Sequence, residues 1–401
     1  MSAVTLTCAP IFADDTTEIL NGQINLDAAI QVVATGETDR ADAANLNSIG
    51  VANALTVDVV TRHDIQSDQT FSGSVETGAS TDVRAIDGTA ITTSTAMGNS
   101  VSVINDAGMD ADIAQSAADG SRVSSSAQLS VSSYAMNSVT SATASANAYQ
   151  STSYGGDNDH RLRQDSGADV TADGYVLAPT GGLGNSATIL GAANGNSARI
   201  EGYYMGPDQV VDTDQDNRGD VTARAGADAG GGAVSTQIVS SANGNSVWMQ
   251  NEYGYARIQG EQNNSGTVTA ESSAEIGNFD IDMVSLSSEG VGNSAIISNI
   301  GSNAYMGVDQ TNTGAVSTTT SLAGGEGGAA LLSATSFGNA ATTYICAECP
   351  VEGWGNTSQV NAATISSAVT GSMTTGNVLT GSATAIGNSA TYQSITPHSG
   401  N

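Results

Sequence analysis

Small or apolar residues alternate with polar residues along most of the chain. In the segment 262–270 (QNNSGTVTA), Gln262, Asn264 and Val268 are separated by even numbers of residues, so they share one face of an extended strand. The segment 291–297 (VGNSAII) alternates in the same way. Apolar stripes with a 3.6-residue period run no further than a turn or two, and β-branched residues and glycines dominate. The pattern therefore predicts an all-β protein.

Two polar residues recur with a spacing of about 48 residues and define a repeat. Glutamine stands at Gln23, Gln69, Gln115, Gln164, Gln215, Gln262, Gln310 and Gln359. Asparagine follows 29 to 32 residues later, at Asn53, Asn99, Asn147, Asn196, Asn245, Asn293, Asn339 and Asn388. Such internal repeats are typical of proteins in which each unit stacks on the next. We therefore expect one β-solenoid or β-helix domain over residues 14–401, built from about eight repeats of 46–51 residues. Turn signals such as GGG at 230, GSN at 301 and GGEGG at 324 predict about four short strands per repeat.

Stacking would place the recurrent amides above one another. Strands stacked in register lie about 4.7 to 4.8 Å apart, so Asn and Gln amides can bond to the copies above and below. We expect the asparagines to form one buried ladder and the glutamines a second. Two residues beyond the glutamine, further asparagines stand at Asn25, Asn217, Asn264, Asn312 and Asn361.

A glycine precedes most of the recurrent asparagines, as in GNSA at 292–295. This glycine would permit a bulge or a bend where neighbouring backbones approach closely. The alternative is that Gly-Asn marks exposed type I′ hairpin turns. Whether one repeat makes one coil or two stays open at this stage.

The charge of the chain excludes one class of partner. The formal net charge is −30, and all ten Lys or Arg residues are Arg. Such a surface repels phosphate backbones, so we expect no binding to nucleic acid. The sequence has no run of 18 apolar residues that would predict a membrane-spanning helix. Residues 1–13 are largely apolar and precede two acidic residues, which is typical of a signal-peptide remnant; an apolar first strand is the alternative.

Candidate catalytic residues are few, and we expect neither enzymatic activity nor a cofactor. His63, His160 and His398 are far apart in the sequence and are interpreted as exposed loop histidines. Acidic and basic residues gather in the segment 157–169, at Asp157, Asp159, His160, Arg161, Arg163, Asp165 and Asp169. A polysaccharide-degrading β-helix enzyme would need such a cluster, and it is the alternative function.

Two further patterns bear on metals and redox chemistry. Asp212, Asp214 and Asp216 resemble the start of a calcium loop, but Asn217 stands where that loop requires Gly, so we expect no metal site. Cys346 and Cys349 form a C-x-x-C pattern without a second pair. We expect a local disulfide before the last repeat, with two free thiols as the alternative.

Three segments carry a family resemblance: CAPIFADDTTEILNGQINLDA at 8–28, the recurring GNSA, and QTNTGAV at 310–316. With its acidic, lysine-free composition, the chain resembles the holdfast anchor protein D family of stalked, Caulobacter-like bacteria. A fainter likeness to curlin-type repeat proteins rests on the N-x4-Q spacing of Asn245 with Gln250 and of Asn388 with Gln393.

The resemblance implies a secreted, non-enzymatic structural protein at the cell surface, on the exterior of the outer membrane. It would anchor an adhesive polysaccharide, the holdfast, to the bacterial envelope. The partners implied are the surface polysaccharide, companion holdfast anchor proteins and a curli-type outer-membrane secretion pore. End-to-end self-association and a general fibre-forming adhesin stay open as alternatives.

Overall fold

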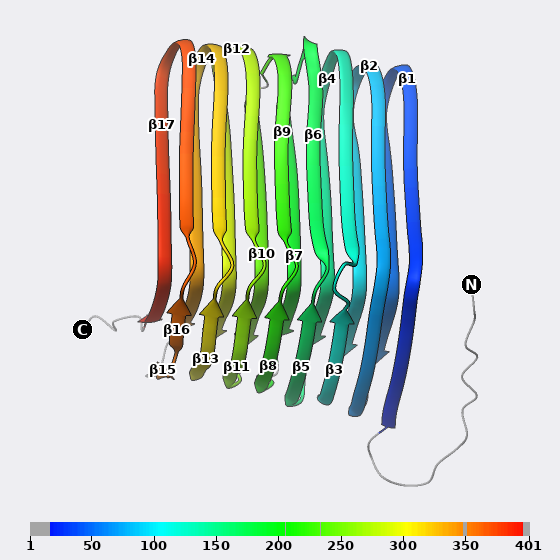
Figure 1. Ribbon diagram of the computed structural model, residues 1–401, viewed down its shortest axis with the longest axis vertical. Helices are drawn as coiled ribbons and strands as arrows, with labels where there is room; N and C mark the ends of the chain where they lie inside the picture. The colour runs from blue at the N-terminus through cyan, green and yellow to red at the C-terminus, as the bar shows by residue number, and fades with distance from the viewer. Residues whose placement is uncertain (1–16, 205, 233, 348–350, 396–401) are drawn as a thin grey trace.

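The computed structural model describes residues 17–204, 206–232, 234–347 and 351–395, and this part of the chain is all-β, as predicted (Figure 1). The longest strands are β1 (Thr17–Val59), β2 (His63–Asn105), β4 (Arg122–Ser153), β12 (Val268–Ile300), β14 (Val316–Cys346) and β17 (Ile365–Ile395). Strands of intermediate length are β6 (Asp169–Gly182), β7 (Ser186–Gly202), β9 (Val221–Gly231) and β10 (Ser235–Glu252). The short strands are β3 (Met109–Ala117), β5 (Asn158–Ser166), β8 (Gln209–Asn217), β11 (Ala256–Asn264), β13 (Ala304–Asn312), β15 (Gly353–Gly355) and β16 (Ser358–Asn361). Among these residues, no helix is long and apolar enough to cross a membrane.

Each repeat lies directly on the one before it. The strands pair in parallel, and paired residues are 45 to 51 positions apart in the sequence. Gln23 pairs with Gln69, and Asn53 pairs with Asn99. One repeat therefore makes one winding of the chain, which answers the question of one coil or two.

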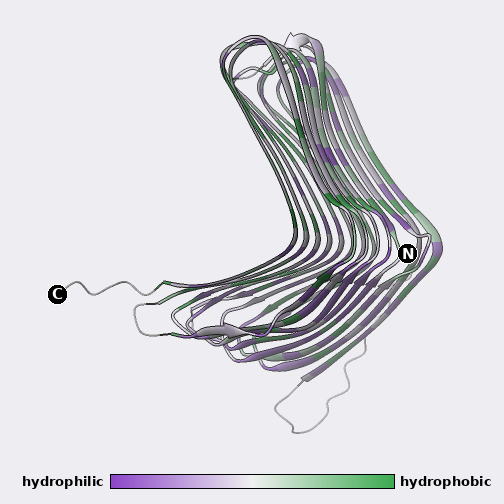
Figure 2. Ribbon diagram, turned by 60° about the vertical axis from the view of Figure 1, so that its left-hand side comes forward, coloured by the Kyte–Doolittle hydropathy of each residue, from purple (hydrophilic) through white to green (hydrophobic). Residues whose placement is uncertain are grey.

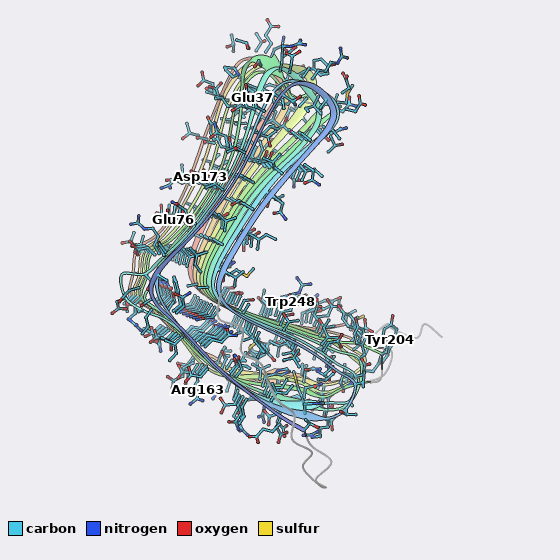
Figure 3. All side chains as sticks on the ribbon, turned by 90° about the vertical axis from the view of Figure 1, so that its right-hand side faces the viewer. Glu37, Glu76, Arg163, Asp173, Tyr204 and Trp248 are labelled. Atoms are coloured by element: carbon cyan, nitrogen blue, oxygen red, sulfur yellow. The ribbon has the colours of Figure 1, made fainter. Side chains whose placement is uncertain are left out.

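Every winding is bent into two arms that meet at an elbow (Figures 2 and 3). In one winding, β11 follows the outer layer of the lower arm to the elbow, and residues 268–277 continue along the outer layer of the upper arm. After the tip, residues 283–291 return along the inner layer of the upper arm, and residues 293–300 line the inner layer of the lower arm. Side chains bridge the layers in both arms: Gln262 donates to the carbonyl of Ser294, and Ser272 donates to that of Ser287.

Small and β-branched side chains fill the space between the layers. Ile86, Ile276 and Phe279 belong to the core of the upper arm, whereas Met109 and Ile258 belong to that of the lower arm. Successive windings place like residues on top of each other, and one fully buried column contains Val75, Val123, Val170, Val221, Val268 and Val316. Burying each such side chain contributes about 1.5–3 kcal/mol, so the stacking itself supplies the hydrophobic core.

The prediction of about four short strands per repeat is wrong. The strands are longer because the chain bends without breaking the parallel pairing: GGEGG at 324–328 lies inside β14, at the tip of the upper arm. The predicted turn at 301–303 does separate β12 from β13, and Gly301 there has a positive φ of 83°.

Candidate functional site

The eight recurrent asparagines lie in one column at the elbow. From Asn53 to Asn339, each Nδ2 donates to the Oδ1 of the asparagine in the next winding, at 2.8 Å in every case. As far as Asn339, the same Nδ2 also donates to a backbone carbonyl of the next winding; for Asn245 this acceptor is the carbonyl of Asn263, at 2.7 Å. The asparagines from Asn99 to Asn339 are completely buried. Each of them therefore ties two windings and two layers together.

The eight recurrent glutamines form a second column with the opposite direction. Each Nε2 from Gln69 to Gln359 donates to the Oε1 of the glutamine in the preceding winding, at 2.7–3.1 Å. Its second hydrogen goes to the carbonyl of the residue that follows the asparagine of its own winding, as from Gln262 to Ser294 at 2.9 Å. Asparagine donors thus point toward the C-terminal end of the stack, and glutamine donors point toward the N-terminal end.

A shorter third column explains the glycine before each asparagine. Asn217 donates to Asn264, Asn264 to Asn312 and Asn312 to Asn361, at 2.7–2.8 Å. The side-chain oxygens of these asparagines lie against Gly195, Gly244, Gly292 and Gly338. A Cβ on any of these glycines would also lie 2.5–2.6 Å from a glycine carbonyl in the next winding.

The Gly-Asn pairs are therefore close-packed positions within strands, and the hairpin-turn alternative is wrong. Gly244 and Asn245, for example, lie inside β10. In the two degenerate copies, Ala52 and Ala146 replace the glycine. The third column changes in the same early windings, where Phe71, Ala117 and Ser166 stand in register with the later asparagines.

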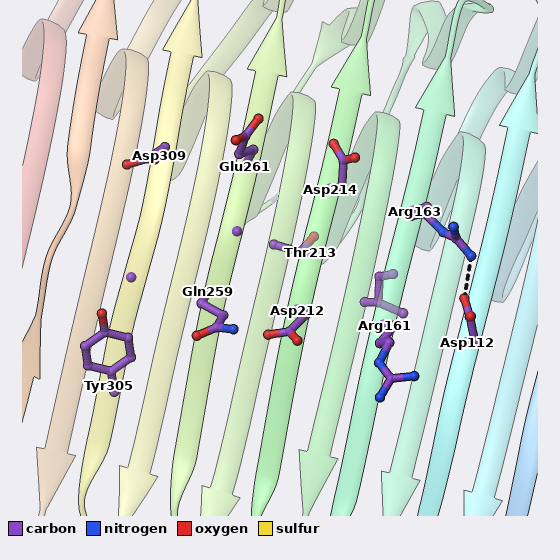
Figure 4. Close-up of a pocket in the computed structure, with 13 residues that line it drawn as sticks. Asp112, Arg161, Arg163, Asp212, Thr213, Asp214, Gln259, Glu261, Tyr305 and Asp309 are labelled. Atoms are coloured by element: carbon purple, nitrogen blue, oxygen red, sulfur yellow. Dashed lines mark hydrogen bonds and ion pairs between the residues drawn. The ribbon is translucent and has the colours of Figure 1, made fainter.

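The outer face of the lower arm carries a hollow of about 550 Å³ across β3, β5, β8, β11 and β13 (Figure 4). Gly260 and Gly307 are among the residues that line it. Tyr305 bounds one end of the hollow, and its ring lies over the Cα of Gly307. At the other end, Arg163 donates from Nη2 to Asp112 at 2.7 Å.

Four of the charged residues in this hollow, Arg163, Asp214, Glu261 and Asp309, come from one position of the repeat that the sequence reasoning missed. The residue before the recurrent glutamine is Asp68, Arg163, Asp214, Glu261 or Asp309 in five of the windings. All five side chains are exposed, because the glutamine beside each of them points inward. The recurrence of a charged residue directly before the glutamine was the signal in the sequence that could have predicted this row. The arrangement offers carboxylate acceptors, a guanidinium donor and an aromatic ring on one surface, which is the set of groups that can hold a polyhydroxylated ligand.

Aromatic side chains gather toward the end of the lower arm, which Tyr204 marks in Figure 3. Trp354 lies 6.2 Å from Tyr305 and 6.3 Å from Tyr255 between ring centroids. Tyr154 stacks with Tyr203 at 6.1 Å and with Tyr204 at 6.4 Å. Only 4% of the residues are aromatic, so this concentration is a distinct feature of the arm.

The interpretation of His160 as an exposed loop residue is wrong. His160 is fully buried in β5, with Nδ1 2.8 Å from the Tyr149 hydroxyl and Nε2 3.0 Å from Gln209 Oε1. Because Gln209 Oε1 can only accept, Nε2 carries the proton and Tyr149 donates to Nδ1. Burial lowers the pKa of His160 to about 4 and raises the pKa of Tyr149. His63 is half-buried at the start of β2. His398 lies outside the described residues.

The charged residues of the segment 157–169 do not converge on one site. His160 points into the core, whereas Arg163 lies on the outer face (Figure 3). Asp165 pairs instead with Arg218, which also contacts Asp119 and Asp216; these carboxylates raise the pKa of the guanidinium.

The calcium-like and cysteine patterns have separate outcomes. Asp212, Asp214 and Asp216 lie along one face of β8, and among the described residues no group of three or more His, Cys, Asp or Glu is placed to hold a metal ion. Cys346 is the half-buried last residue of β14, and its predicted partner Cys349 lies outside the described residues. Residues 1–13, with the predicted signal-peptide remnant, lie outside them as well.

Comparisons with known proteins bear on identity at this point. Neither the curated proteins nor the solved structures contain a match to this chain. A family profile described as holdfast attachment protein D matches residues 38–316, which span about six windings and include most of both amide columns. The match covers well over half of the 401 residues, so the chain belongs to the holdfast attachment protein D family.

Proposed function

We propose that this chain is a secreted β-solenoid that anchors an adhesive polysaccharide, the holdfast, to the bacterial envelope. Membership of an attachment protein family supports the role, and the stacked windings support the mechanism. The observation that carries the proposal is the charged hollow on the outer face of the lower arm, which spans five windings and has Tyr305 at one end.

Binding would rest on many weak contacts in a row. Sugar hydroxyls would donate to Asp214, Glu261 and Asp309 and accept from Arg163, while the ring of Tyr305 would pack against a pyranose face. Because the windings repeat, one chain of sugars can occupy several equivalent positions, and the linked contacts reinforce each other. The amide columns hold this surface rigid, so little ordering is required on binding.

The compartment and partners follow from the same proposal. We infer a location on the exterior of the outer membrane, with export through a curli-type pore and association with companion holdfast anchor proteins. The acidic surface and a Cys346–Cys349 disulfide suit an oxidising, extracellular setting. We also infer that the role is structural rather than enzymatic, because the acids and bases of the segment 157–169 are divided between the core and the outer face. Incubation with surface polysaccharide should then release no new reducing ends.

A retention assay tests the anchoring role. Cells that lack the protein should lose their adhesive polysaccharide on washing, and the wild-type chain should restore it. A double variant, Tyr305→Ala with Glu261→Gln, removes one ring and one charge from the hollow and should restore less. The matched control is Trp248→Ala, which removes an aromatic ring that stacks on Arg199 at 4.7 Å inside the angle between the arms (Figure 3). Polysaccharide that stays attached without the protein would refute the proposal.

A further inference from the structure

The two amide columns give the stack a direction, and this direction determines what each end exposes. At the N-terminal end, Gln23 donates one Nε2 hydrogen to the carbonyl of Ala54, and its second hydrogen faces the open edge. Asn53 Oδ1 at the same end accepts from no asparagine among the described residues. At the C-terminal end, the described residues include no next asparagine to which Asn388 Nδ2 could donate and no next glutamine from which Gln359 Oε1 could accept.

These exposed groups are complementary. A donor at Asn388 on one end corresponds to an acceptor at Asn53 on the other, and an acceptor at Gln359 corresponds to a donor at Gln23.

The two end windings also match in register and in apolar groups. Ile365 stands 23 residues before Asn388, and Ile30 stands 23 residues before Asn53. Both isoleucines are only partly buried, although they continue the fully buried valine column of the interior. Among the described strands, β1 pairs only with β2 and β17 pairs only with β14, so each has an edge of free backbone N–H and C=O groups. Such edges pair readily with another strand.

We propose that copies of this chain stack head to tail, with the β17 edge of one copy on the β1 edge of the next. The asparagine and glutamine columns then continue across the junction: Asn388 donates to Asn53, and Gln23 donates to Gln359. A second copy fits because it presents the same bent outline, the same register and the opposite hydrogen-bonding groups. Head-to-head contact is disfavoured, since it would place Gln23 donors against Gln23 donors. This assembly goes beyond the anchoring role and does not depend on it.

Two isosteric substitutions block one end each. Both keep the hydrogen bond that the residue accepts within the column, and both give up the one that it donates to a carbonyl of its own winding. Asn388→Asp still accepts from Asn339 but presents a carboxylate to Asn53 of the next copy. Gln23→Glu still accepts from Gln69 but presents a carboxylate to Gln359. The matched control is Asn194→Asp, which adds the same charge to a middle winding at a residue that only accepts, from Asn243.

Analytical ultracentrifugation over a concentration series, with electron microscopy, measures the outcome on the full chain. We expect wild type and Asn194→Asp to form rods that lengthen with concentration, and each end variant alone to stay monomeric. An equimolar mixture of the two end variants should stop at a dimer, because each still has one competent end; this result also shows that both variants are folded. Monomeric wild type throughout the series, or end variants that form rods like wild type, would overturn the proposal.

Discussion

Replacing Asn245 by Leu removes one rung from the middle of the asparagine column. Asn245 is completely buried, and three neighbours depend on its amide. Asn196 would lose its acceptor, at 2.8 Å. Asn293 Oδ1 and the carbonyl of Asn263 would lose their donor, at 2.8 and 2.7 Å. The leucine side chain can offer none of these hydrogen bonds, and water cannot enter the close-packed elbow to replace them.

The size of the stability loss follows from the three polar groups that lose a hydrogen-bond partner. A buried polar group without a partner costs about 1–3 kcal/mol. Some groups keep a second hydrogen bond, and the leucine gains apolar burial, so we expect a loss of roughly 3–6 kcal/mol in the free energy of unfolding. Domains are typically stable by only about 5–15 kcal/mol, so the change should be visible in any equilibrium measurement.

Urea unfolding followed by far-ultraviolet circular dichroism measures the loss, and hydrogen exchange shows whether it is confined to the neighbouring windings, as nearest-neighbour coupling in a stacked repeat protein predicts. Asn388→Leu is the control: this residue is exposed and ends the column, so its loss affects only the Asn339 donor and the exposed bond to the carbonyl of Gln359. A change below about 1 kcal/mol for Asn245→Leu would refute the view that interior rungs depend on one another.

Three further predictions follow from named contacts. Gly244→Ala should lose about 1–3 kcal/mol of stability, because its Cβ would lie 2.6 Å from the carbonyl of Gly292, whereas Gly78→Ala, with nothing within 4 Å, should be neutral or slightly stabilising in the same thermal melts. For His160, burial favours the neutral form: its pKa is about 4 in the fold against about 6.5 in the unfolded chain, so its contribution is complete above pH 6.5 and falls as the pH drops toward 4. The stability difference between wild type and His160→Leu should therefore shrink by roughly 3 kcal/mol from pH 7 to pH 4, and a constant difference would contradict the burial. If Cys346 and Cys349 form a disulfide, the protein unfolded without reductant should react with thiol reagents at neither residue; reaction at both would favour the free-thiol alternative.

The sequence predicts which residues form the columns because stacking converts a spacing along the chain into a distance in space. Gln262 and Gln310 are 48 residues apart in the sequence, and their amides meet at 2.7 Å. The alternation also predicts which side chains point inward. His160 lies four residues before the inward-pointing Gln164, so the same rule would have placed it in the core. The error came from treating an isolated histidine as a loop residue rather than applying the strand period.

Other features depend on contacts between positions with no fixed spacing. The direction in which the amides of a column donate depends on where the backbone acceptor of each amide lies. For Asn245 this acceptor is a carbonyl of the next winding, whereas for Gln262 it is a carbonyl of its own winding. The elbow is partly hidden: in the outer layer a short break separates β11 from β12, whereas in the inner layer the chain bends within strands such as β10. The outer hollow joins residues of five windings, so finding it requires the register to be known to the residue.

The amide columns fix the register between windings, which the other core side chains cannot do. Its side chains are mostly Ala, Val, Ser and Thr, which have similar sizes, so sliding one winding by two residues would exchange like for like at a small packing cost. The same slide would separate every Asn from Asn and every Gln from Gln, and would leave buried donors and acceptors unpaired in each winding. The columns therefore specify one register along the entire stack. That register is also what aligns Arg163, Asp214, Glu261 and Asp309 into a single row on the outer face, so the buried amides fix the geometry of the surface on which attachment would depend.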